Sequence, residues 1–128
     1  MSYLVDTNGW IAFFEDSPVL SDSAAEIIEA GFDDCYVSIA SIWEAAIKVG
    51  IGKLKLPYDL KRDLPGLLED NGLQILSISV EDSLAVTDLA AFHGDPFDRI
   101  QVAQAQRRNW QVISRDGIFD RYGLTRIW

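Results

Sequence analysis

Short apolar segments alternate with longer segments of helical periodicity from one end of the chain to the other. Short apolar runs rich in β-branched or aromatic residues are typical of buried strands. Predicted strands occupy residues 3–5, 35–37, 73–78, 110–113 and 124–128. Apolar residues that recur every three or four positions indicate helices. Predicted helices, the first of them opening with a turn, occupy residues 7–15, 23–30, 39–49, 58–70, 81–91 and 96–108.

Several residues mark where these helices begin, end or break. Ser23 and Glu26 have the spacing of a capping box, and Gly31 is a stop signal for the same helix. Pro65 lacks the N–H that a helix interior needs, so we expect an interruption in the fourth helix. The fifth helix is expected to place its apolar residues on one face, which comprises Leu84, Ala85, Leu89 and Phe92.

The order of these elements predicts the fold class. Strands that alternate with helices form parallel sheets covered by helices on both faces. A chain of 128 residues fits one compact domain. We therefore predict a single α/β domain over residues 1–128, with a central parallel sheet inside an α/β/α sandwich.

Composition supports this fold and indicates the compartment. The chain is 48% hydrophobic and contains 4 Trp, 4 Tyr and 6 Phe, enough for a core. Cys35 is the only cysteine, which excludes an internal disulfide and fits a reducing cytoplasm. No apolar run approaches the roughly 18 residues of a membrane span, and no basic region precedes the first strand. We expect a cytoplasmic protein without membrane segments.

The charge of the chain initially argues against a nucleic-acid partner. The formal net charge is −9, and residues 1–47 contain acidic side chains but no Lys or Arg. Phosphate binding normally depends on Lys and Arg. An RNA partner is therefore expected only if bound cations reverse the local charge.

Two acids follow predicted strands directly or nearly so. Asp6 ends the first strand and Asp116 comes shortly after the fourth. Each could simply form a turn or cap a helix, and Thr7 and Asn8 could either orient Asp6 or close its turn. Ligands of open α/β sheets, however, bind beyond the carboxyl ends of the strands. Two acids at equivalent strand ends therefore favour a shared site.

Glu44 also has a structural and a functional interpretation. Ser41 and Glu44 have capping-box spacing, and Lys48 lies four residues on, in the favoured order for a helical ion pair. The neighbours of Glu44 are mostly apolar, and an ionised carboxylate among them is costly unless it is paired or binds a metal. We favour the functional interpretation on this desolvation argument.

The segment from His93 to Arg99 resembles a helix start. Asp95 as N-cap, Pro96 in the first turn and Asp98 two residues later satisfy the usual preferences. Either acid could serve the helix alone, or a helix start near other acids could hold a metal ligand. His93 is interpreted as a hydrogen-bonded loop residue without a catalytic role.

Converging carboxylates without bases repel one another, and hard divalent cations relieve that repulsion. Mg²⁺ and Mn²⁺ favour oxygen ligands and can activate water against a phosphodiester. Asp120, one helical turn beyond Asp116, is either a further acid of the cluster or a surface residue. No zinc ligand set, phosphate-binding loop or nucleophile elbow is present.

With these residues assembled, the chain resembles the PIN-domain family, and within it the VapC toxins of prokaryotic toxin–antitoxin pairs. The resemblance spans nearly the whole chain in order. Its segments are YLVDTN (3–8), SIWEAAIK (41–48), GKLKLP (52–57), HGDPFDR (93–99), QVAQA (101–105), SRD (114–116) and RIW (126–128). Two departures are Ser114, where Thr is more usual, and Gly9-Trp10, where two aliphatic residues are commoner.

The resemblance implies a Rossmann-like sandwich with strand order 3-2-1-4-5. It also implies Mg²⁺- or Mn²⁺-dependent endoribonuclease activity on RNA, a homodimer, and inhibition by a cognate VapB-type antitoxin. By position, the family's catalytic and metal-binding acids fall on Asp6, Glu44, Asp98 and Asp116. Auxiliary candidates are Asn8, Asp95, Ser114 and Asp120.

Two other classes share some of these features. A receiver domain of phospho-signalling is also acidic and α/β, but it needs an Asp at the end of its third strand, where this chain has Leu76-Ser-Ile-Ser79. A binding module whose acids only cap helices is the third class. Such a module predicts no binding of divalent metals, and acetyl phosphate should label only the receiver.

Overall fold

The centre of the molecule is a parallel sheet of five strands in the order β3-β2-β1-β4-β5. The computed structural model describes residues 1–128. The strands are β1 (Tyr3–Val5), β2 (Cys35–Ser38), β3 (Leu73–Leu76), β4 (Gln111–Ile113) and β5 (Arg126–Ile127). Tyr3 pairs with Cys35 on one side and Gln111 on the other, which fixes the register of the central strand. The predicted strand order is confirmed.

Both faces of the sheet are buried. Successive side chains along a strand point to opposite faces, and each face packs into its own hydrophobic cluster. Val5 and Ile113 belong to one hydrophobic cluster, whereas their neighbours Leu4 and Val112 belong to a second. All four side chains are fully buried. This double burial explains why the strands read as continuous apolar runs rather than as alternating ones.

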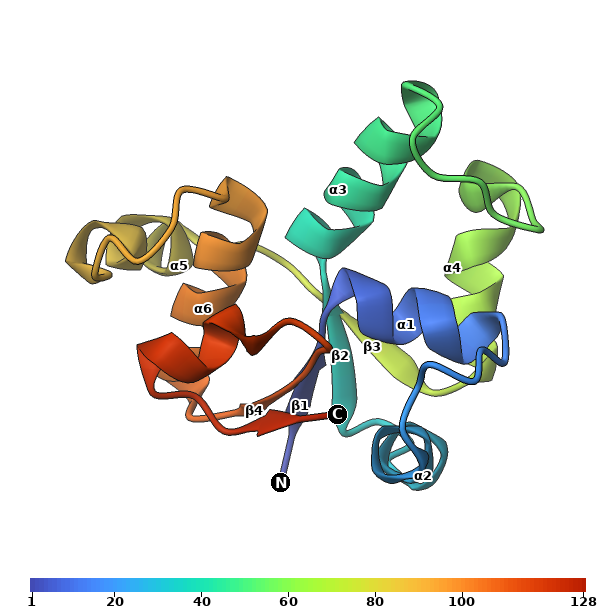
Figure 1. The fold of residues 1–128 in the computed structure, drawn as a ribbon, viewed down its shortest axis with the longest axis horizontal. Helices are drawn as coiled ribbons and strands as arrows, with labels where there is room; N and C mark the ends of the chain where they lie inside the picture. The colour runs from blue at the N-terminus through green and yellow to red at the C-terminus, as the bar shows by residue number, and fades with distance from the viewer.

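Helices cover the two faces of the sheet (Figure 1). The α-helices are α1 (Thr7–Phe14), α2 (Asp22–Ala30), α3 (Ile39–Gly50), α4 (Leu60–Asp70), α5 (Val80–Ala85) and α6 (Pro96–Arg108). The 3₁₀-helices are η1 (Val86–Asp88) and η2 (Gly117–Tyr122). Helices α1 to α4 supply the cluster around Val5, and α6 with η2 supplies the cluster around Leu4. The predicted α/β/α sandwich is confirmed.

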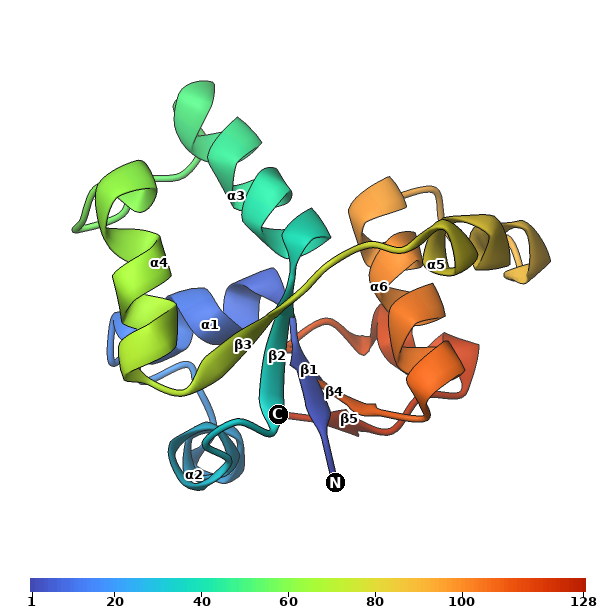
Figure 2. The ribbon, with the colours of Figure 1, turned by 180° about the vertical axis from the view of Figure 1, so that it is seen from behind.

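The connection after β3 carries the chain from one face to the other. Figure 2 shows α4 on one side of β3 and the chain running across to α5 on the opposite side.

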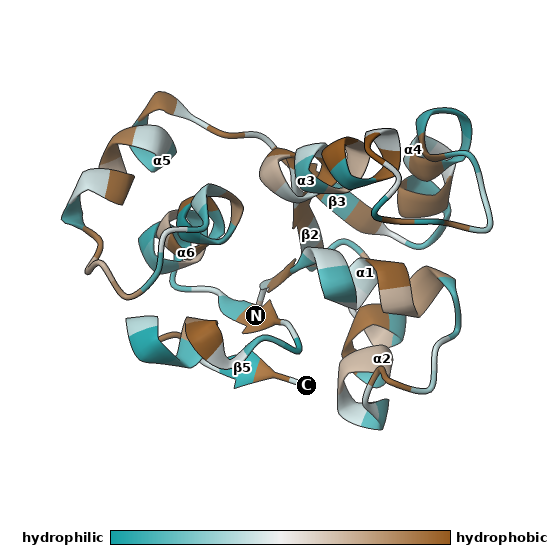
Figure 3. Cartoon of the chain, turned by 45° about the horizontal axis from the view of Figure 1, so that its top comes forward, coloured by the Kyte–Doolittle hydropathy of each residue, from teal (hydrophilic) through white to brown (hydrophobic).

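Figure 3 shows hydrophobic residues on both α3 and α4, the two helices that border an apolar groove. None of the helices is long and apolar enough to cross a membrane.

The predicted capping box of Ser23 and Glu26 is wrong, and the capping-box alternative for Ser41 and Glu44 does not form either, although both helices form and α3 begins at Ile39 as predicted. Ser21, not Ser23, caps α2 by accepting a hydrogen bond from the Ala24 N–H at 3.1 Å. Ser38 caps α3, so Ser41 lies inside that helix. In each case an earlier serine with extended backbone takes the N-cap position, which allows the helix to begin sooner.

The predicted interruption at Pro65 and the predicted length of the fifth helix are also wrong. Helix α4 continues through Pro65, because Leu64 and Leu68 on one face are buried in the core and hold the turn in place. Helix α5 ends at Ala85 and η1 follows. Leu84 is 64% exposed, so α5 is not held by the expected apolar face. Ion pairs of Asp82 with Arg107 and Arg108 hold α5 against α6 instead.

Candidate active site

Acidic side chains gather in one pocket at the carboxyl ends of the strands. The pocket has a volume of about 260 Å³. Asp6 directly follows β1, Glu44 lies in α3, Asp98 lies in α6, and Asp116 lies in the segment after β4. These are the four acids predicted from the sequence. Asn8 and Asp95 also line the pocket.

Asp6 is the most enclosed of these acids. Asp6 is the N-cap of α1, and its Oδ1 accepts hydrogen bonds from the Thr7 N–H at 2.8 Å and from Gln101 Nε2 at 3.1 Å. Its Oδ2 accepts from Ser114 Oγ at 2.9 Å and, at the longer distance of 3.5 Å, from Asn8 Nδ2. Burial raises the pKa of Asp6 in spite of these donors, and the charge of Glu44 adds to the effect. None of the partners of Asp6 carries a positive charge.

Glu44 is held by a chain of hydroxyl groups that starts at a buried tryptophan. Trp10 Nε1 donates to Ser41 Oγ at 2.7 Å, and Ser41 lies 2.6 Å from Thr7 Oγ1. Thr7 Oγ1 donates to Glu44 Oε1 at 2.7 Å. The indole N–H can only donate, so Ser41 Oγ accepts from it and donates to Thr7 Oγ1. Thr7 Oγ1 in turn donates to the Glu44 carboxylate. The chain fixes one oxygen of Glu44 at the bottom of the pocket.

The other oxygen of Glu44 meets the one lysine that lines the pocket. Lys48 Nζ lies 3.2 Å from Glu44 Oε2, the ion pair expected from the spacing in α3. The Lys48 side chain is 48% exposed, whereas that of Glu44 is 11% exposed. Lys48 therefore covers the rim and can swing into solvent without disturbing the core.

Asp95 and Asp98 lie at the start of α6, as predicted. Asp95 Oδ1 accepts from the backbone N–H of Phe97 at 2.9 Å and of Asp98 at 3.2 Å. Asp98 lies in the first turn and is 8% exposed. Burial raises the pKa of Asp98 to about 8, with further contributions from the charges of Asp6, Asp95, Glu44 and Asp116. The two acids thus differ. Asp95 caps the helix at the edge of the pocket, whereas Asp98 is buried close to the other acidic side chains.

Asp116 is the most exposed of the four predicted acids. It caps η2 by accepting from the Ile118 N–H at 3.0 Å, and its own N–H donates to Ser114 Oγ at 3.0 Å. Ser114 therefore joins Asp116 to Asp6. Asp120 lies outside the pocket and pairs with Arg126 through two contacts of 3.0 and 3.1 Å.

Comparison with known proteins identifies the family. A sequence profile of the PIN domain matches residues 3–124. The chain belongs to the PIN domain family. No curated protein sequence matches the chain closely enough to be called a relative.

Solved structures share the fold of this PIN domain at low sequence identity. A chain of the DNA-bound VapBC complex from Salmonella typhimurium is 16% identical with a TM-score of 0.74, and the match covers 99% of this chain and 97% of that one. VapBC2 from Rickettsia felis, bound to a promoter DNA fragment, is 20% identical with a TM-score of 0.68 over 99% and 98%. FitAcB from Neisseria gonorrhoeae is 19% identical with a TM-score of 0.68 over 98% and 96%.

Several residues that build the site of this PIN domain were not predicted from the sequence. Gln101 donates to Asp6 from 95 residues away, and Ser41 joins Thr7 and Trp10, which lie 34 and 31 residues from it, in the chain that holds Glu44. Gln101 carries the one available signal, since it is a polar residue on the buried side of α6. His93, interpreted as a loop residue, lies 3.2 Å from Asp98 Oδ2.

The donor set of the pocket fits a hard divalent cation. It consists of carboxylate oxygens supplemented by an amide and a hydroxyl, the ligands that Mg²⁺ and Mn²⁺ prefer. No three of the acids converge closely enough to bind one ion by themselves as the side chains stand. Mg²⁺ usually keeps several waters and takes only one or two carboxylates directly, so this spacing agrees with such an ion.

Proposed function

We propose that this PIN domain is an endoribonuclease that requires Mg²⁺ or Mn²⁺ bound at the acid pocket. The observation that carries the proposal is the gathering of Asp6, Glu44, Asp98 and Asp116 in one pocket, where burial raises the pKa of Asp6 and of Asp98. Buried acids in this state need a cation that the chain does not supply, since Lys48 reaches only the rim. Membership of a family whose domains are generally nucleases supports the same reaction class.

Each acid has a distinct role in this proposal. Asp6, Glu44, Asp98 and Asp116 would hold the metal, one or two of them directly and the others through its waters. When bound, the metal would polarise the phosphodiester and lower the pKa of the water that attacks it. Ser114 and Gln101 hold Asp6, and Thr7 holds Glu44, so both carboxylates keep one orientation. Among the auxiliary candidates, Asn8 and Ser114 orient Asp6 and Asp95 orients the start of α6. Asp120 has the weakest support, because it is engaged by Arg126.

We further propose that the enzyme is the VapC-like toxin of a type II toxin–antitoxin pair, with a VapB-type antitoxin as its partner. Solved structures of the same fold are described as VapBC and FitAB complexes, which supports this assignment. The acid pocket would receive a basic side chain of the antitoxin, which would neutralise the same carboxylates that hold the metal. A complex whose contacts all avoid the pocket would refute this part of the proposal.

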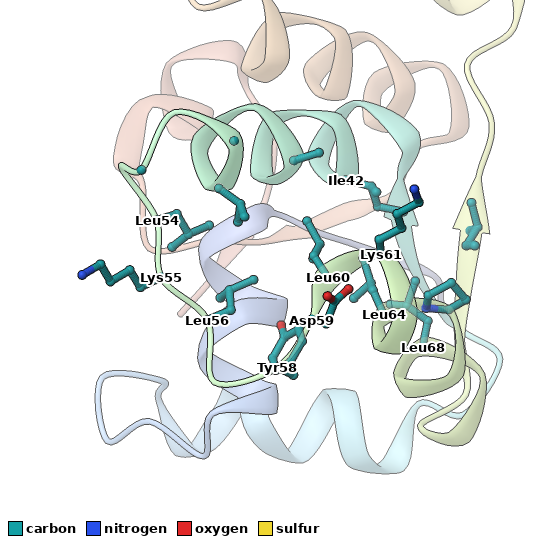
Figure 4. A pocket seen from close by; sticks show the side chains of 16 residues that line it. Ile42, Leu54, Lys55, Leu56, Tyr58, Asp59, Leu60, Lys61, Leu64 and Leu68 are labelled. Atoms are coloured by element: carbon teal, nitrogen blue, oxygen red, sulfur yellow. The ribbon is translucent and has the colours of Figure 1, made fainter.

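An apolar groove beside the acid pocket gives such a partner a second contact. The groove lies between α3, α4 and the segment that joins them, and has a volume of about 1080 Å³ (Figure 4). Leu54 lines both the groove and the acid pocket. A peptide that lies in the groove can therefore reach Glu44 and Lys48 without leaving the surface.

The homodimer that the resemblance implies is supported by an apolar row on α3. Ile39, Trp43 and Ile47 are spaced four residues apart and are 40%, 60% and 38% exposed. Residues with this spacing lie on one face of a helix. We propose that a second copy covers this row.

Cleavage by metal-stripped protein tests the ribonuclease proposal. Protein treated with EDTA should leave RNA intact, and addition of Mn²⁺ or Mg²⁺ should restore cleavage. Asp6→Asn should remain inactive at every metal concentration while keeping the wild-type circular dichroism spectrum. Cleavage that persists in EDTA, or full activity in Asp6→Asn, would contradict the proposed site. Labelling by acetyl phosphate would favour the receiver-like alternative.

A further inference from the structure

A chain of hydrogen bonds leads away from the acid pocket through the single histidine of the protein. Asp98 Oδ2 lies 3.2 Å from His93 Nε2, and His93 Nδ1 lies 2.8 Å from the hydroxyl of Tyr122. The Tyr122 hydroxyl in turn lies 3.1 Å from Arg99 Nη1. We call Arg99, Tyr122 and His93 the relay. Neither His93 nor Tyr122 lines the acid pocket, so the relay contacts the site only through Asp98.

The chemistry of the two ends favours one direction for the hydrogen bonds of the relay, the one in which every donor has an acceptor. A guanidinium can only donate, so the Tyr122 oxygen accepts from Arg99 and keeps its own proton free to donate. That proton goes to His93 Nδ1, which must then be the acceptor nitrogen of a neutral imidazole. When Asp98 is ionised, at a pH above its pKa of about 8 or with a metal bound, the remaining proton of the ring sits on Nε2 and is donated to Asp98 Oδ2. In that state the relay favours one tautomer of His93.

Tyr122 is well placed to hold this arrangement. Its side chain is 9% exposed, and its ring packs edge-on against Phe92 with centroids 5.1 Å apart. Tyr122 is the last residue of η2, the short helix that Asp116 caps. Its carbonyl oxygen accepts from Gln106 Nε2 at 3.1 Å, which ties the end of η2 to α6. The relay thus connects the segment that carries Asp116 with the helix start that carries Asp98.

Arg99 anchors the other side of the relay. Its Nη1 also donates to the carbonyl oxygen of Ala90 at 2.8 Å, and it lies 3.4 Å from the carbonyl oxygen of His93. These contacts fix the segment that leads into α6. The imidazole of His93 is therefore positioned from both its backbone and its ring.

We propose that His93 and Tyr122 are positioning residues for the metal site, which orient the Asp98 carboxylate and set its place relative to Asp116. The proposal rests on the proposed function. Asp98 Oδ2 is held by His93, whereas Oδ1 accepts no hydrogen bond within the chain and stays available to a ligand. Hydrogen-bonded partners of metal ligands commonly affect metal affinity or activity by about 10–100-fold. His93 and Tyr122 supply this support for Asp98, as Ser114 and Gln101 do for Asp6.

Tyr122→Phe tests the relay with little disturbance of the core, because it removes the hydroxyl and keeps the ring against Phe92. Tyr36→Phe is the matched control, since Tyr36 is a partly buried tyrosine that stacks on Trp110 and whose hydroxyl makes no hydrogen bond. We expect Tyr122→Phe to weaken Mn²⁺ binding by about tenfold and to lower kcat with little change in the KM for RNA. Tyr36→Phe should match the wild type in both measurements.

His93→Ala and His93→Gln distinguish positioning from simple packing. Both remove the imidazole, but the amide of Gln can still donate to Asp98. Gln should therefore recover a large part of the Mn²⁺ affinity that Ala loses. Equal losses in the two variants, with equal losses of stability, would show that His93 only fills space and would overturn the proposal.

Nitrogen-15 NMR of the imidazole gives a readout that needs neither metal nor RNA. Because His93 is the only histidine, its ring signals are unambiguous. At a pH above the pKa of Asp98, about 8, wild-type protein should show the neutral tautomer protonated at Nε2, and Tyr122→Phe should show a mixture of tautomers. An Nδ1-protonated ring, or wild-type Mn²⁺ affinity in Tyr122→Phe, would overturn the relay. Wild-type protein that binds Mn²⁺ with the expected tautomer but cuts no RNA would instead contradict the proposed function alone.

Discussion

Two buried aspartates of this protein have opposite surroundings. Asp82 in α5 is fully buried and accepts from Arg107, Arg108 and the backbone N–H of Ser79. Burial alone would raise its pKa, but these donors, Arg108 foremost, hold the pKa of Asp82 well below its usual range. Asp98 is almost as deeply buried, yet it faces other acids, and its pKa is raised to about 8.

The two carboxylates differ in whether the chain supplies a positive charge beside them. Asp82 has such partners and stabilises the fold, whereas Asp98 has none. Asp82 has its cations within the chain, and they join α5 to α6 through its carboxylate. Asp98 and Asp6 have hydrogen-bond donors but no positive partner. Burial of an unpaired charge costs stability, so such a cluster is expected where function requires it.

The same contrast occurs within α6. Gln101 and Gln104 are both fully buried, and each leaves its Oε1 without a hydrogen-bond partner. Gln101 donates to Asp6 in the acid pocket, whereas Gln104 donates to Asp82 at 3.4 Å. One helix therefore serves the acid pocket near its start and the Asp82 network farther along.

Exchanging the two aspartates for asparagine should separate activity from stability. Asp98→Asn is expected to lower Mn²⁺-dependent RNA cleavage by at least about a hundredfold, the size of effect seen when a group that stabilises a transition state is lost. Asp82→Asn should keep wild-type activity per folded molecule. Rates measured on folded fractions of equal concentration would test this. A comparable loss of activity in both variants would remove the distinction.

Stability should show the reverse order. Asp82→Asn leaves two arginines without their carboxylate and should cost about 2 kcal/mol, less than for a fully enclosed pair because both arginines can reach solvent. At a pH above the pKa of Asp98, about 8, Asp98→Asn removes like-charge repulsion and should leave the urea midpoint unchanged or higher. Asp63→Asn, which breaks the exposed Arg62 pair, is the matched control and should shift the midpoint far less. A stable Asp82→Asn would contradict the structural role.

The pH dependence of the metal-free protein should carry the signature of Asp98. Because folding raises its pKa from 3.8 to about 8, the folded state binds the proton more tightly than the unfolded chain. The stability that Asp98 contributes is complete below pH 3.8 and is lost as the pH rises toward about 8. The free energy of unfolding should therefore fall between these two pH values. Urea titrations at several pH values should show a smaller fall in Asp98→Asn. An identical slope in both proteins would exclude Asp98 as its source.

The glutamine pair should give the smallest effects. Leu in place of either glutamine removes an unpartnered buried oxygen, so stability should change by no more than about 1 kcal/mol. Gln101→Leu should lower activity by about tenfold because Asp6 loses one of its donors. Gln104→Leu should cleave RNA at the wild-type rate, and an equal loss in both would place the effect in α6 as a whole.

Much of the fold could be predicted from the sequence, because strands buried on both faces give a strong local signal. The predicted strand over 35–37 and the helix over 96–108 agree with β2 and α6 nearly to the residue. The capping residues were predicted less well than the helices: Ser21 and Ser38 cap α2 and α3, although later serines have the better motif. The early end of α5 was not predicted either. The contacts that hold this helix join Asp82 to arginines more than 20 residues away, which a local sequence pattern does not reveal.

The candidate site shows the same limit. Strand ends and desolvation pointed to Asp6, Asp116 and Glu44, which are local features of the sequence. The partners that orient the acids come from distant segments, such as Ser114 for Asp6 and Trp10 for the chain that ends at Glu44. Their roles depend on tertiary contacts that periodicity and spacing do not encode.

Titration of Mn²⁺ into metal-free wild-type protein, followed by calorimetry near neutral pH, tests the central claim most directly. The account predicts binding in the millimolar range or tighter, with release of a proton, because Asp98 is largely protonated until the metal arrives. Buffers with different ionisation enthalpies would reveal that proton. Absence of any binding at millimolar Mn²⁺ would show that the acid pocket is not a metal site and would contradict the account.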